Sequence, residues 1–298
     1  MASLTLSAPA KINLFLDITG RRPDGYHTIS GIMQAISLCD TVTLTLKPVI
    51  DEEAPRYTLT CTNPDLPTDG KNLALRAAFA FFDATGTGNT HLHIHIEKRI
   101  PAAAGMAGGS TNAAAVLKGL NALMGHPLTQ EALCRVGLSL GADVPFCIKG
   151  GAQITEGVGE ILTPCASLCT CYLVIACAGE GVSTPAAYKK LDEIYDSFDG
   201  TVYTPKTDAL ASQLESLRNG DIVGAGKCAY NIFESVVLPT HSMAGQIKST
   251  LERAGAVFAM MSGSGPSVFG VFADEEAAHA AAESLRNQDI PTWVCEPV

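Results

Sequence analysis

Two kinds of hydrophobic spacing alternate along the chain. Apolar residues at every second position are typical of strands, and in the first half they cover 11–18, 42–46 and 91–97. Apolar residues three or four positions apart are typical of helices, and they cover 71–84, 110–124 and 129–140. Gly86 is expected to end the first of these helices, and Thr129 is expected to cap the third.

A second group of elements begins near Pro164. Strands are predicted over 171–177, 256–261, 267–272 and 291–294. Helices are predicted over 185–195, 207–217, 240–254 and 274–287. The polar, turn-rich segment 196–205 is expected to be an exposed connection. This order of strands and helices predicts α+β layers, and 298 residues suggest roughly two domains.

Composition excludes several classes of protein. Apolar residues make up 47% of the chain and charged residues 17%, so a sizeable core can form and disorder is excluded. The net charge of -10 disfavours a nucleic-acid-binding surface, which has to be basic. A small anion needs only a local cluster of cations, which the following residues are candidates to supply: Lys11, Arg21, Arg22, Lys98 and Arg99.

Cysteine usage and the absence of long apolar runs indicate a cytoplasmic protein. Ten cysteines lie mostly in apolar stretches, and a chain of this length does not need disulfides, so reduced thiols are expected. No apolar run approaches the roughly 18 residues of a membrane span. No basic residue precedes Lys11, so we expect no secretory leader.

The segment 101–112 is the first candidate site and reads Pro-Ala-Ala-Ala-Gly-Met-Ala-Gly-Gly-Ser-Thr-Asn. It lies between a predicted strand and a predicted helix. Small residues let backbone N–H groups approach a ligand, and a helix start adds free donors, so the segment suits the phosphates of ATP. Ser110 and Thr111 are candidates to cap the helix, contact phosphate or help hold Mg²⁺. The alternative is an ordinary loop in which Ser110 caps the helix.

Lys11 and Asn13 share one face of the first predicted strand. They could orient a substrate hydroxyl, although a solvated strand face is the alternative. Asp143 lies in Gly-Ala-Asp-Val-Pro, and a carboxylate between apolar residues needs a partner. It could accept a proton from an attacking hydroxyl with Lys11 keeping it ionised, or it could form a structural ion pair or a helix cap.

Two further loops are candidates for ligand contacts. The loop 262–267, Ser-Gly-Ser-Gly-Pro-Ser, could close over phosphates or form a plain hairpin. The turn 24–27, Asp-Gly-Tyr-His, could recognise a ring or be a surface hairpin. His91, His93 and His95 share a strand face, but no fourth metal ligand lies nearby in sequence, so a metal site there is disfavoured.

Taken in order, these motifs resemble the GHMP kinases, which include galactokinase and the homoserine and mevalonate kinases. Within that superfamily the chain is most similar to the 4-diphosphocytidyl-2-C-methyl-D-erythritol kinases. The residues behind this resemblance are Ala-Pro-Ala-Lys-Ile-Asn-Leu at 8–14, Arg-Pro-Asp-Gly-Tyr-His at 22–27, Gly-Ala-Asp-Val-Pro at 141–145 and Glu-Gly-Val-Gly-Glu at 156–160. The chain departs from the family pattern where alanines 102, 103, 104 and 107 replace common glycines.

The resemblance implies an α+β fold of two domains. Residues 1–162 would form an ATP-binding domain like domain 2 of ribosomal protein S5, and residues 163–298 a ferredoxin-like domain. The implied activity is ATP-dependent phosphorylation of the 2-hydroxyl of 4-diphosphocytidyl-2-C-methyl-D-erythritol in the non-mevalonate isoprenoid precursor pathway. The implied cofactors are ATP and Mg²⁺, without nucleic acid or membrane partners, in a monomer or weak homodimer.

The resemblance also implies roles for individual residues. Asp143 would be the base, and Lys11 would polarise the hydroxyl. Residues in the nucleotide site would be Asn72, Pro101, Gly105, Met106, Ala107, Gly108, Gly109, Ser110, Thr111 and Asn112. Residues that contact the cytidine-linked substrate would be Asn13, Tyr26, His27 and Tyr188. Ser110 is the candidate metal ligand.

Three alternatives remain open at this stage. The acceptor could be homoserine or mevalonate, as in other kinases of the superfamily. The chain could be a non-catalytic ligand sensor on the same fold, although such a sensor should have lost Lys11 or Asp143. It could also be a nucleic-acid-binding module, which the net charge of -10 disfavours.

Overall fold

The computed structural model describes residues 1–49, 56–88, 90–177, 181–198 and 202–298. The chain divides into two compact units, each built from several segments. Unit 1 comprises Met1–Ala10, Cys39–Pro101 and Ala107–Lys149, and unit 2 comprises Lys11–Leu38, Ala102–Met106 and Gly150–Val298. The chain therefore passes between the units several times, and the domain boundary expected at residue 162 stays a prediction.

Unit 1 contains a sheet in the order β3-β4-β2-β1. Its strands belong to β1 (Ala2–Arg21), β2 (His27–Pro48), β3 (Tyr57–Cys61) and β4 (Thr90–Glu97), with only the outer halves of β1 and β2 included. The register pairs Val42 with Ile96 and Leu44 with Ile94, and all four side chains are buried. The alternating pattern in the sequence thus corresponds to one apolar face of this sheet.

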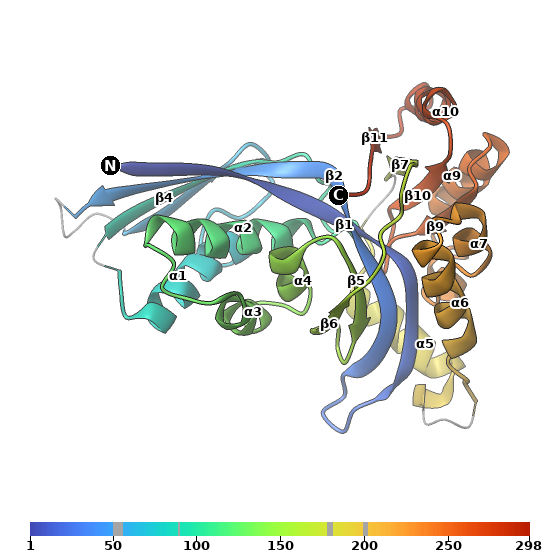
Figure 1. The fold of residues 1–298 in the computed structure, drawn as a ribbon, viewed down its shortest axis with the longest axis horizontal. Helices are drawn as coiled ribbons and strands as arrows, with labels where there is room; N and C mark the ends of the chain where they lie inside the picture. Colours follow the sequence, from blue (N-terminus) through green and yellow to red (C-terminus); the bar gives the residue numbers. More distant parts are fainter. Residues whose placement is uncertain (50–55, 89, 178–180, 199–201) are drawn as a thin grey trace. The chain divides into compact units, whose positions relative to one another are not determined.

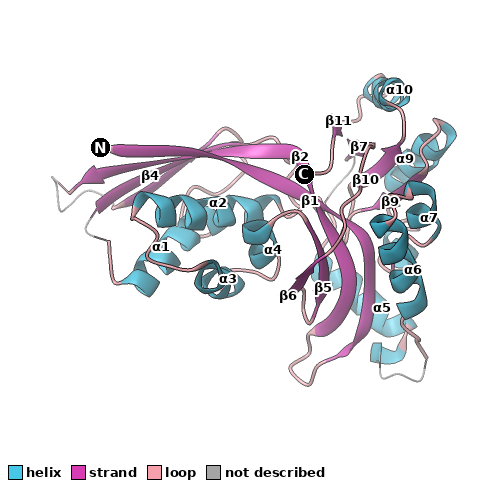
Figure 2. Ribbon diagram, viewed as in Figure 1, coloured by secondary structure: helices cyan, strands magenta, loops and turns pink. Residues whose placement is uncertain are grey.

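Four helices lie on one face of the unit 1 strands (Figures 1 and 2). They are α1 (Leu73–Thr85), α2 (Gly108–Leu123), α3 (Gln130–Leu138) and α4 (Val144–Lys149). Gly86 ends α1 in the left-handed conformation with φ 63°, and the Thr129 side chain caps α3 by accepting from the Ala132 N–H, as predicted.

Close packing between α2 and the sheet depends on Gly119. A Cβ atom at Gly119 would lie 2.5 Å from Leu44 Cδ1 and 2.8 Å from Leu6 Cδ1. The absence of a side chain lets the helix approach the strands, so the apolar residues next to it, Val116, Leu117 and Leu120, are fully buried.

Unit 2 contains a four-stranded antiparallel sheet in the order β11-β7-β10-β9. Its strands are β7 (Tyr172–Ala176), β9 (Phe258–Met261), β10 (Val268–Phe272) and β11 (Thr292–Cys295). Helices α9 (Ser242–Arg253) and α10 (Glu275–Arg286) pack against it. Numbered along the chain, this strand order is 4-1-3-2, so the ferredoxin-like prediction for the second half is confirmed.

The inner halves of β1 and β2 also belong to unit 2. There β1 pairs with β8 (Tyr230–Asn231), and β2 pairs with β5 (Ala152–Glu156), which pairs with β6 (Ile161–Pro164). The other helices of this unit are α5 (Thr184–Ile194), a 3₁₀ turn at Asp196–Phe198, α6 (Thr207–Arg218), α7 (Ile222–Lys227) and α8 (Glu234–Val237).

The expectation of an exposed connection at 196–205 holds only in part, because Asp196, Val202 and Thr204 are exposed whereas the aromatic residues Phe198 and Tyr203 are not. Phe198 is buried, and the Tyr203 hydroxyl donates a hydrogen bond to the Asp17 carboxylate. The Lys206 N–H donates to the same carboxylate over 2.8 Å. Burial raises the pKa of Asp17, and these hydrogen bonds oppose that rise. Tyr203 thus anchors the segment to β1, and Phe198 packs against His27 of β2, while residues 199–201 lie outside the described chain.

Within the described ranges, no helix combines the length and the apolar character that crossing a membrane requires.

We predict that Gly119→Val lowers the free energy of unfolding by about 1–3 kcal/mol, because the new methyl groups overpack the space beside Leu44 and Leu6. The matched control is Gly245→Val in α9, where a Cβ meets no atom within 4 Å. The control should change stability by less than about 0.5 kcal/mol. Urea denaturation of both variants measures the difference, and equal stability would contradict the packing argument.

Candidate functional site

Helix α2 starts two residues earlier than the sequence predicted and has no capping side chain. Its first residue is Gly108, and its N-cap is Ala107 in the left-handed conformation with φ 57°. The alternative in which Ser110 caps this helix is therefore wrong. The amides of the first turn receive no side-chain acceptor at the N-cap, whereas the Thr111 N–H already bonds to the Ala107 carbonyl. Such a helix start favours an anion.

A buried carboxylate that the sequence analysis missed supports this helix start. Asp40 is fully buried and accepts from the Lys98 ammonium over 2.6 Å and from the Asn112 side-chain amide over 2.8 Å. It also accepts from the backbone N–H groups of Arg99 and Ile100, at 2.7 and 2.8 Å. One carboxylate thus ties the residues that directly follow β4 to the N-terminal part of α2, within unit 1.

Several predicted nucleotide residues have structural contacts of their own. Asn112 donates to Asp40, and Thr111 beside it is buried. Asn72 caps α1 by accepting from the Ala74 N–H, and its amide donates to the Pro67 carbonyl over 2.7 Å. Both polar ends of the Asn72 side chain are thus engaged within unit 1, and a contact between Asn72 and adenine stays a prediction.

Asp143 lies directly before α4 and is half-buried. Its carbonyl accepts from the Cys147 N–H over 3.1 Å. Among the residues that the structure describes, its carboxylate makes neither the ion pair nor the helix-cap hydrogen bond considered as alternatives. A half-buried carboxylate without such partners is able to accept a proton from a bound ligand.

Lys11 and Asn13 are buried together in unit 2. Their exposed fractions are 4% and 1%, so the alternative of a solvated strand face is wrong. The Lys11 ammonium donates to Asn13 Oδ1 over 2.6 Å. Asn13 Nδ2 is buried and has no hydrogen-bond partner within the described chain. A buried donor without a partner is rare in proteins, and a ligand atom or water would supply its acceptor.

Three segments that the sequence singled out meet around this pair, all within unit 2. The Lys11 N–H donates to the Met106 carbonyl over 3.2 Å, which places the first strand against the segment Ala102–Met106. The Ser262 hydroxyl donates to the Gly105 carbonyl over 3.0 Å. A Cβ atom at Gly263 would lie 3.3 Å from Lys11 Nζ, so the 262–267 loop lies beside the ammonium.

Glycine is required where these segments touch. A Cβ atom at Gly105 would overlap the Ser262 carbonyl oxygen, and Gly105 has φ 74°. The 262–267 loop is a hairpin between β9 and β10, yet it also contacts the segment Ala102–Met106. The two alternatives considered for it, ligand loop and hairpin turn, are therefore compatible.

The turn 24–27 has one exposed and one buried aromatic residue. Tyr26 is 66% exposed, whereas the His27 imidazole is buried. His27 stacks on the ring of Tyr188, with centroids 4.6 Å apart and an angle of 15° between the planes. Tyr188 lies in α5, so two of the predicted cytidine contacts, remote in sequence, meet in unit 2.

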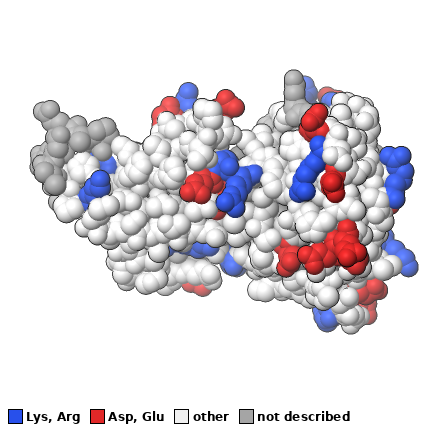
Figure 3. Space-filling view, turned by 90° about the horizontal axis from the view of Figure 1, so that it is seen from above, with Lys and Arg blue, Asp and Glu red and all other residues white. Residues whose placement is uncertain are grey.

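Three of the five predicted cations, Arg21, Arg22 and Lys98, are already engaged in ion pairs. The Lys98 ammonium bonds to Asp40 and to the Ile100 carbonyl. Arg21 lies 3.5 Å from the Asp192 carboxylate, and Arg22 lies 2.6 Å from that of Asp24. On the face seen in Figure 3, basic and acidic side chains are interspersed, and the described residues form no continuous basic band there.

His93 and His95 of β4 bond to threonines of β3. His93 bonds to Thr58 and Thr60, at 3.0 and 3.2 Å, and His95 bonds to Thr60 at 2.8 Å. No group of three or more His, Cys, Asp or Glu side chains is placed to hold a metal ion in the described parts of the chain.

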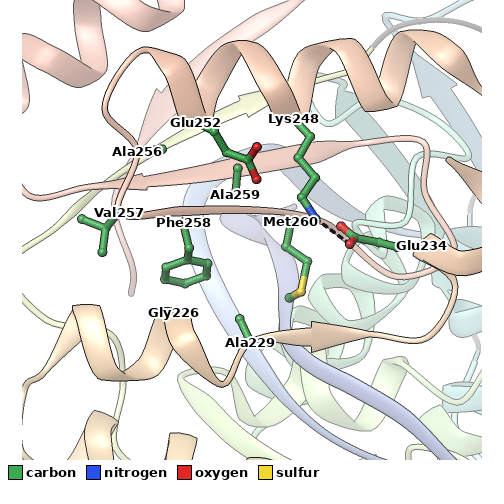
Figure 4. A pocket seen from close by; sticks show the side chains of 10 residues that line it. All are labelled: Gly226, Ala229, Glu234, Lys248, Glu252, Ala256, Val257, Phe258, Ala259 and Met260. Carbon is green, nitrogen blue, oxygen red and sulfur yellow. Dashed lines mark hydrogen bonds and ion pairs between the residues drawn. The ribbon is translucent and has the colours of Figure 1, made fainter.

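A separate hollow of unit 2 contains none of the predicted site residues (Figure 4). Across it, the Lys248 ammonium donates to Glu234 Oε2 over 2.6 Å. The other carboxylate oxygen accepts from the Met261 N–H over 2.8 Å, directly before the 262–267 loop. This ion pair therefore stabilises the end of β9, where that loop begins.

Two alanines in the 101–109 loop adopt backbone conformations that favour glycine. Ala103 has φ 50° and Ala107 has φ 57°. These are positions where the resemblance noted above leads one to expect glycine. The loop keeps its path despite the methyl groups, at a cost of about 1–2 kcal/mol per left-handed residue.

Comparison with known proteins gives two family matches. Residues 72–151 match the GHMP kinases N terminal domain, and residues 213–290 match the GHMP kinases C terminal domain. The first match includes α1, α2 and Asp143. The second includes β8, the 262–267 loop, strands β9 and β10 of the four-stranded sheet and the helices α9 and α10.

Relatives match over nearly the whole chain. A 4-diphosphocytidyl-2-C-methyl-D-erythritol kinase of Alkaliphilus metalliredigens is 42% identical, with 96% of this chain and 93% of the relative covered. A kinase of the same name from Gloeobacter violaceus is 41% identical, with 99% of this chain and 95% of the relative covered. A solved structure of 4-(cytidine 5'-diphospho)-2C-methyl-D-erythritol kinase is 30% identical and has a TM-score of 0.76, with 98% of each chain covered. A homoserine kinase of Cytophaga hutchinsonii, 18% identical over 100% of this chain and 98% of its own, shares the fold with a TM-score of 0.74.

We predict that Ala103→Gly keeps or raises the free energy of unfolding, by up to about 1 kcal/mol, because relief of left-handed strain offsets the greater entropy of the unfolded chain. The neighbouring exposed Ala102 has no positive φ and is the matched control. Ala102→Gly should lose about 0.5–1 kcal/mol. Thermal unfolding of both variants decides this, and an equal loss in both would contradict the strain at Ala103.

Proposed function

This chain belongs to the GHMP kinases, and from that premise we propose that it phosphorylates the 2-hydroxyl of 4-diphosphocytidyl-2-C-methyl-D-erythritol. Kinases of this family imply ATP as the phosphoryl donor and a small molecule as the acceptor. The observation that carries the specific substrate is identity of about 40% to such kinases along nearly the whole chain. The homoserine and mevalonate kinases with the same fold are 14–18% identical, which supports the fold alone.

The geometry agrees with phosphoryl transfer, which depends mainly on positioning and on stabilising charge. The first turn of α2 offers backbone N–H groups to the phosphates, with Gly108, Gly109 and Ser110 at its start. In unit 2, Gly105 and Met106 lie beside Lys11 and the 262–267 loop. We infer that Pro101 and 105–112 hold the triphosphate, with Asn72 near the adenine.

Asp143 and Lys11 are the residues to which we assign the chemistry. The Asp143 carboxylate would accept the proton of the substrate hydroxyl, a role worth roughly 10²–10⁴-fold in rate. The Lys11 ammonium would stabilise negative charge as it develops on the transferred group. Asn13 would orient Lys11 through its 2.6 Å hydrogen bond and would offer its unpaired Nδ2 to the methylerythritol end of the substrate.

The residues present suit a Mg²⁺ ion shared with ATP. Mg²⁺ usually takes one or two protein ligands and completes its octahedron with phosphate oxygens and water, so no dedicated cluster of acids is needed. The Ser110 hydroxyl in the first turn of α2 is the ligand we propose. When bound, the ion would neutralise phosphate charge.

The cytidine end of the substrate would bind at Tyr26, His27 and Tyr188. The Tyr188 ring is a candidate for stacking on the base, and the exposed Tyr26 is a second aromatic surface. We further propose a cytoplasmic enzyme that acts as a monomer or weak homodimer. The sensor alternative is disfavoured, because Lys11 and Asp143 are both retained.

The purified protein should consume ATP with 4-diphosphocytidyl-2-C-methyl-D-erythritol and form a product with phosphate on the 2-hydroxyl, as measured by coupled ADP release and ³¹P NMR. Homoserine and mevalonate serve as matched acceptors and should give less than about 1% of that kcat/KM, since a buried site with unmet hydrogen bonds rejects analogues by 10⁴–10⁵. A higher kcat/KM with homoserine or mevalonate than with the cytidine substrate would show that the proposed substrate is wrong. Absence of turnover with all three acceptors would favour the alternative in which the protein is a non-catalytic ligand sensor.

Asp143→Ala should lower kcat by roughly 10²–10⁴-fold while leaving the affinity for ATP near that of the unchanged protein, because the proton acceptor is lost and the phosphate donors remain. Glu131→Ala, an exposed acid in the first turn of α3, is the control and should keep kcat within about twofold. Steady-state kinetics and ATP titration give both quantities. Near-normal turnover by the Asp143→Ala variant would remove the base assignment.

A further inference from the structure

Helix α5 holds the imidazole of His27 with two side chains one turn apart. Tyr188 and Asp192 are at positions i and i+4, so they lie on the same face of the helix. Tyr188 stacks on the imidazole face at 4.6 Å between centroids. Asp192 Oδ1 lies 2.7 Å from His27 Nε2, at the edge of the ring. Tyr188 thus fixes the plane of the imidazole, and Asp192 fixes its rotation within that plane. Asp192 is 165 positions away from His27 in the chain.

The protonation of the ring follows from this contact. A carboxylate can only accept, so Nε2 must carry the hydrogen that Asp192 receives. The His27 ring also forms a T-shaped pair with Phe198, with an angle of 84° between the planes and centroids 5.6 Å apart. Because the ring is buried and held on these sides, it works as a fixed support beneath Tyr188 rather than as a mobile polar group.

Asp192 is itself held mainly by His27. Its side chain is 18% exposed, and its second oxygen lies 3.5 Å from an Arg21 nitrogen whose side chain is 39% exposed. A long, exposed ion pair of this kind contributes little. The short hydrogen bond to the imidazole is therefore the contact through which Asp192 acts.

We propose that Asp192 is a positioning residue for recognition of the substrate's nucleobase: it holds His27 against Tyr188 and so sets the plane on which a pyrimidine ring stacks. The proposal rests on the proposed function, because it assumes a base-bearing acceptor at Tyr188. Asp192 touches neither ATP nor the reacting hydroxyl in this scheme. Its loss should therefore weaken binding of one substrate and leave the chemical step intact.

Steady-state kinetics with both substrates tests the proposal. Asp192→Ala should raise KM for the cytidine substrate on the order of tenfold, the scale of one lost hydrogen bond to a charged group, with kcat and KM for ATP within about twofold. Asp192→Asn keeps an acceptor oxygen and should restore KM to within about threefold. Glu193→Gln, the exposed neighbour on α5, is the control and should change none of these quantities.

A double-mutant cycle shows whether Asp192 acts through His27. In a His27→Ala background, Asp192→Ala should raise KM no further, because the two residues form one unit. Additive effects would show that Asp192 acts by another route and would overturn the proposal. Asp192→Ser replaces Asp192→Ala in the cycle if thermal unfolding shows that the alanine variant is unstable.

A measurement without substrate separates this proposal from the proposed function. Side-chain ¹⁵N NMR of His27, assigned by its loss in His27→Gln, should show a single Nε2-protonated tautomer that becomes a mixture in Asp192→Ala. Identical spectra of the unchanged protein and Asp192→Ala would show that Asp192 does not fix the tautomer of His27. An unchanged KM for the cytidine substrate in Asp192→Ala would overturn the positioning role. Failure of the unchanged protein to phosphorylate the cytidine substrate would instead overturn the proposed function, with the NMR result still reporting on the contact.

Discussion

One buried carboxylate supports the part of unit 1 in which phosphates are proposed to bind. Asp40 accepts four hydrogen bonds, from Lys98, Arg99, Ile100 and Asn112, at 2.6 to 2.8 Å. A charge without water is tolerated only when it is paired and fully hydrogen-bonded, and Asp40 meets both conditions. Because its partners come from both sides of the glycine-containing loop, the start of α2 has a fixed place relative to β4.

Neighbouring positions in the sequence were enough to predict the longer helices and the strands of the four-stranded sheet, since each depends on local spacing. The short elements β3, β5, β6, β8, α4, α7 and α8 were not predicted. The helix ends at Gly86 and Thr129 and the alternation in β4 all follow from residues a few positions apart. The motif order indicated the ferredoxin-like sheet, and the candidate segments around Lys11 do meet in unit 2.

Contacts between distant residues could not be predicted in this way. Asp40 and Asn112 are 72 positions apart, and His27 and Asp192 are 165 apart, so no local pattern reveals either pair. A carboxylate inside the apolar run 35–46 was the one available signal for Asp40. The burial of Phe198 was also missed, because the polar, turn-rich residues around it gave no local pattern that predicts a buried side chain.

The long first strand has a consequence for the order in which the protein folds. Phe15 pairs with Tyr230, so the inner half of β1 gains this neighbour only after more than two hundred further residues have left the ribosome. Contacts this remote in sequence are formed slowly. Until that pairing forms, one edge of this apolar strand is open to other strands, and an open edge of this kind favours aggregation of the nascent chain.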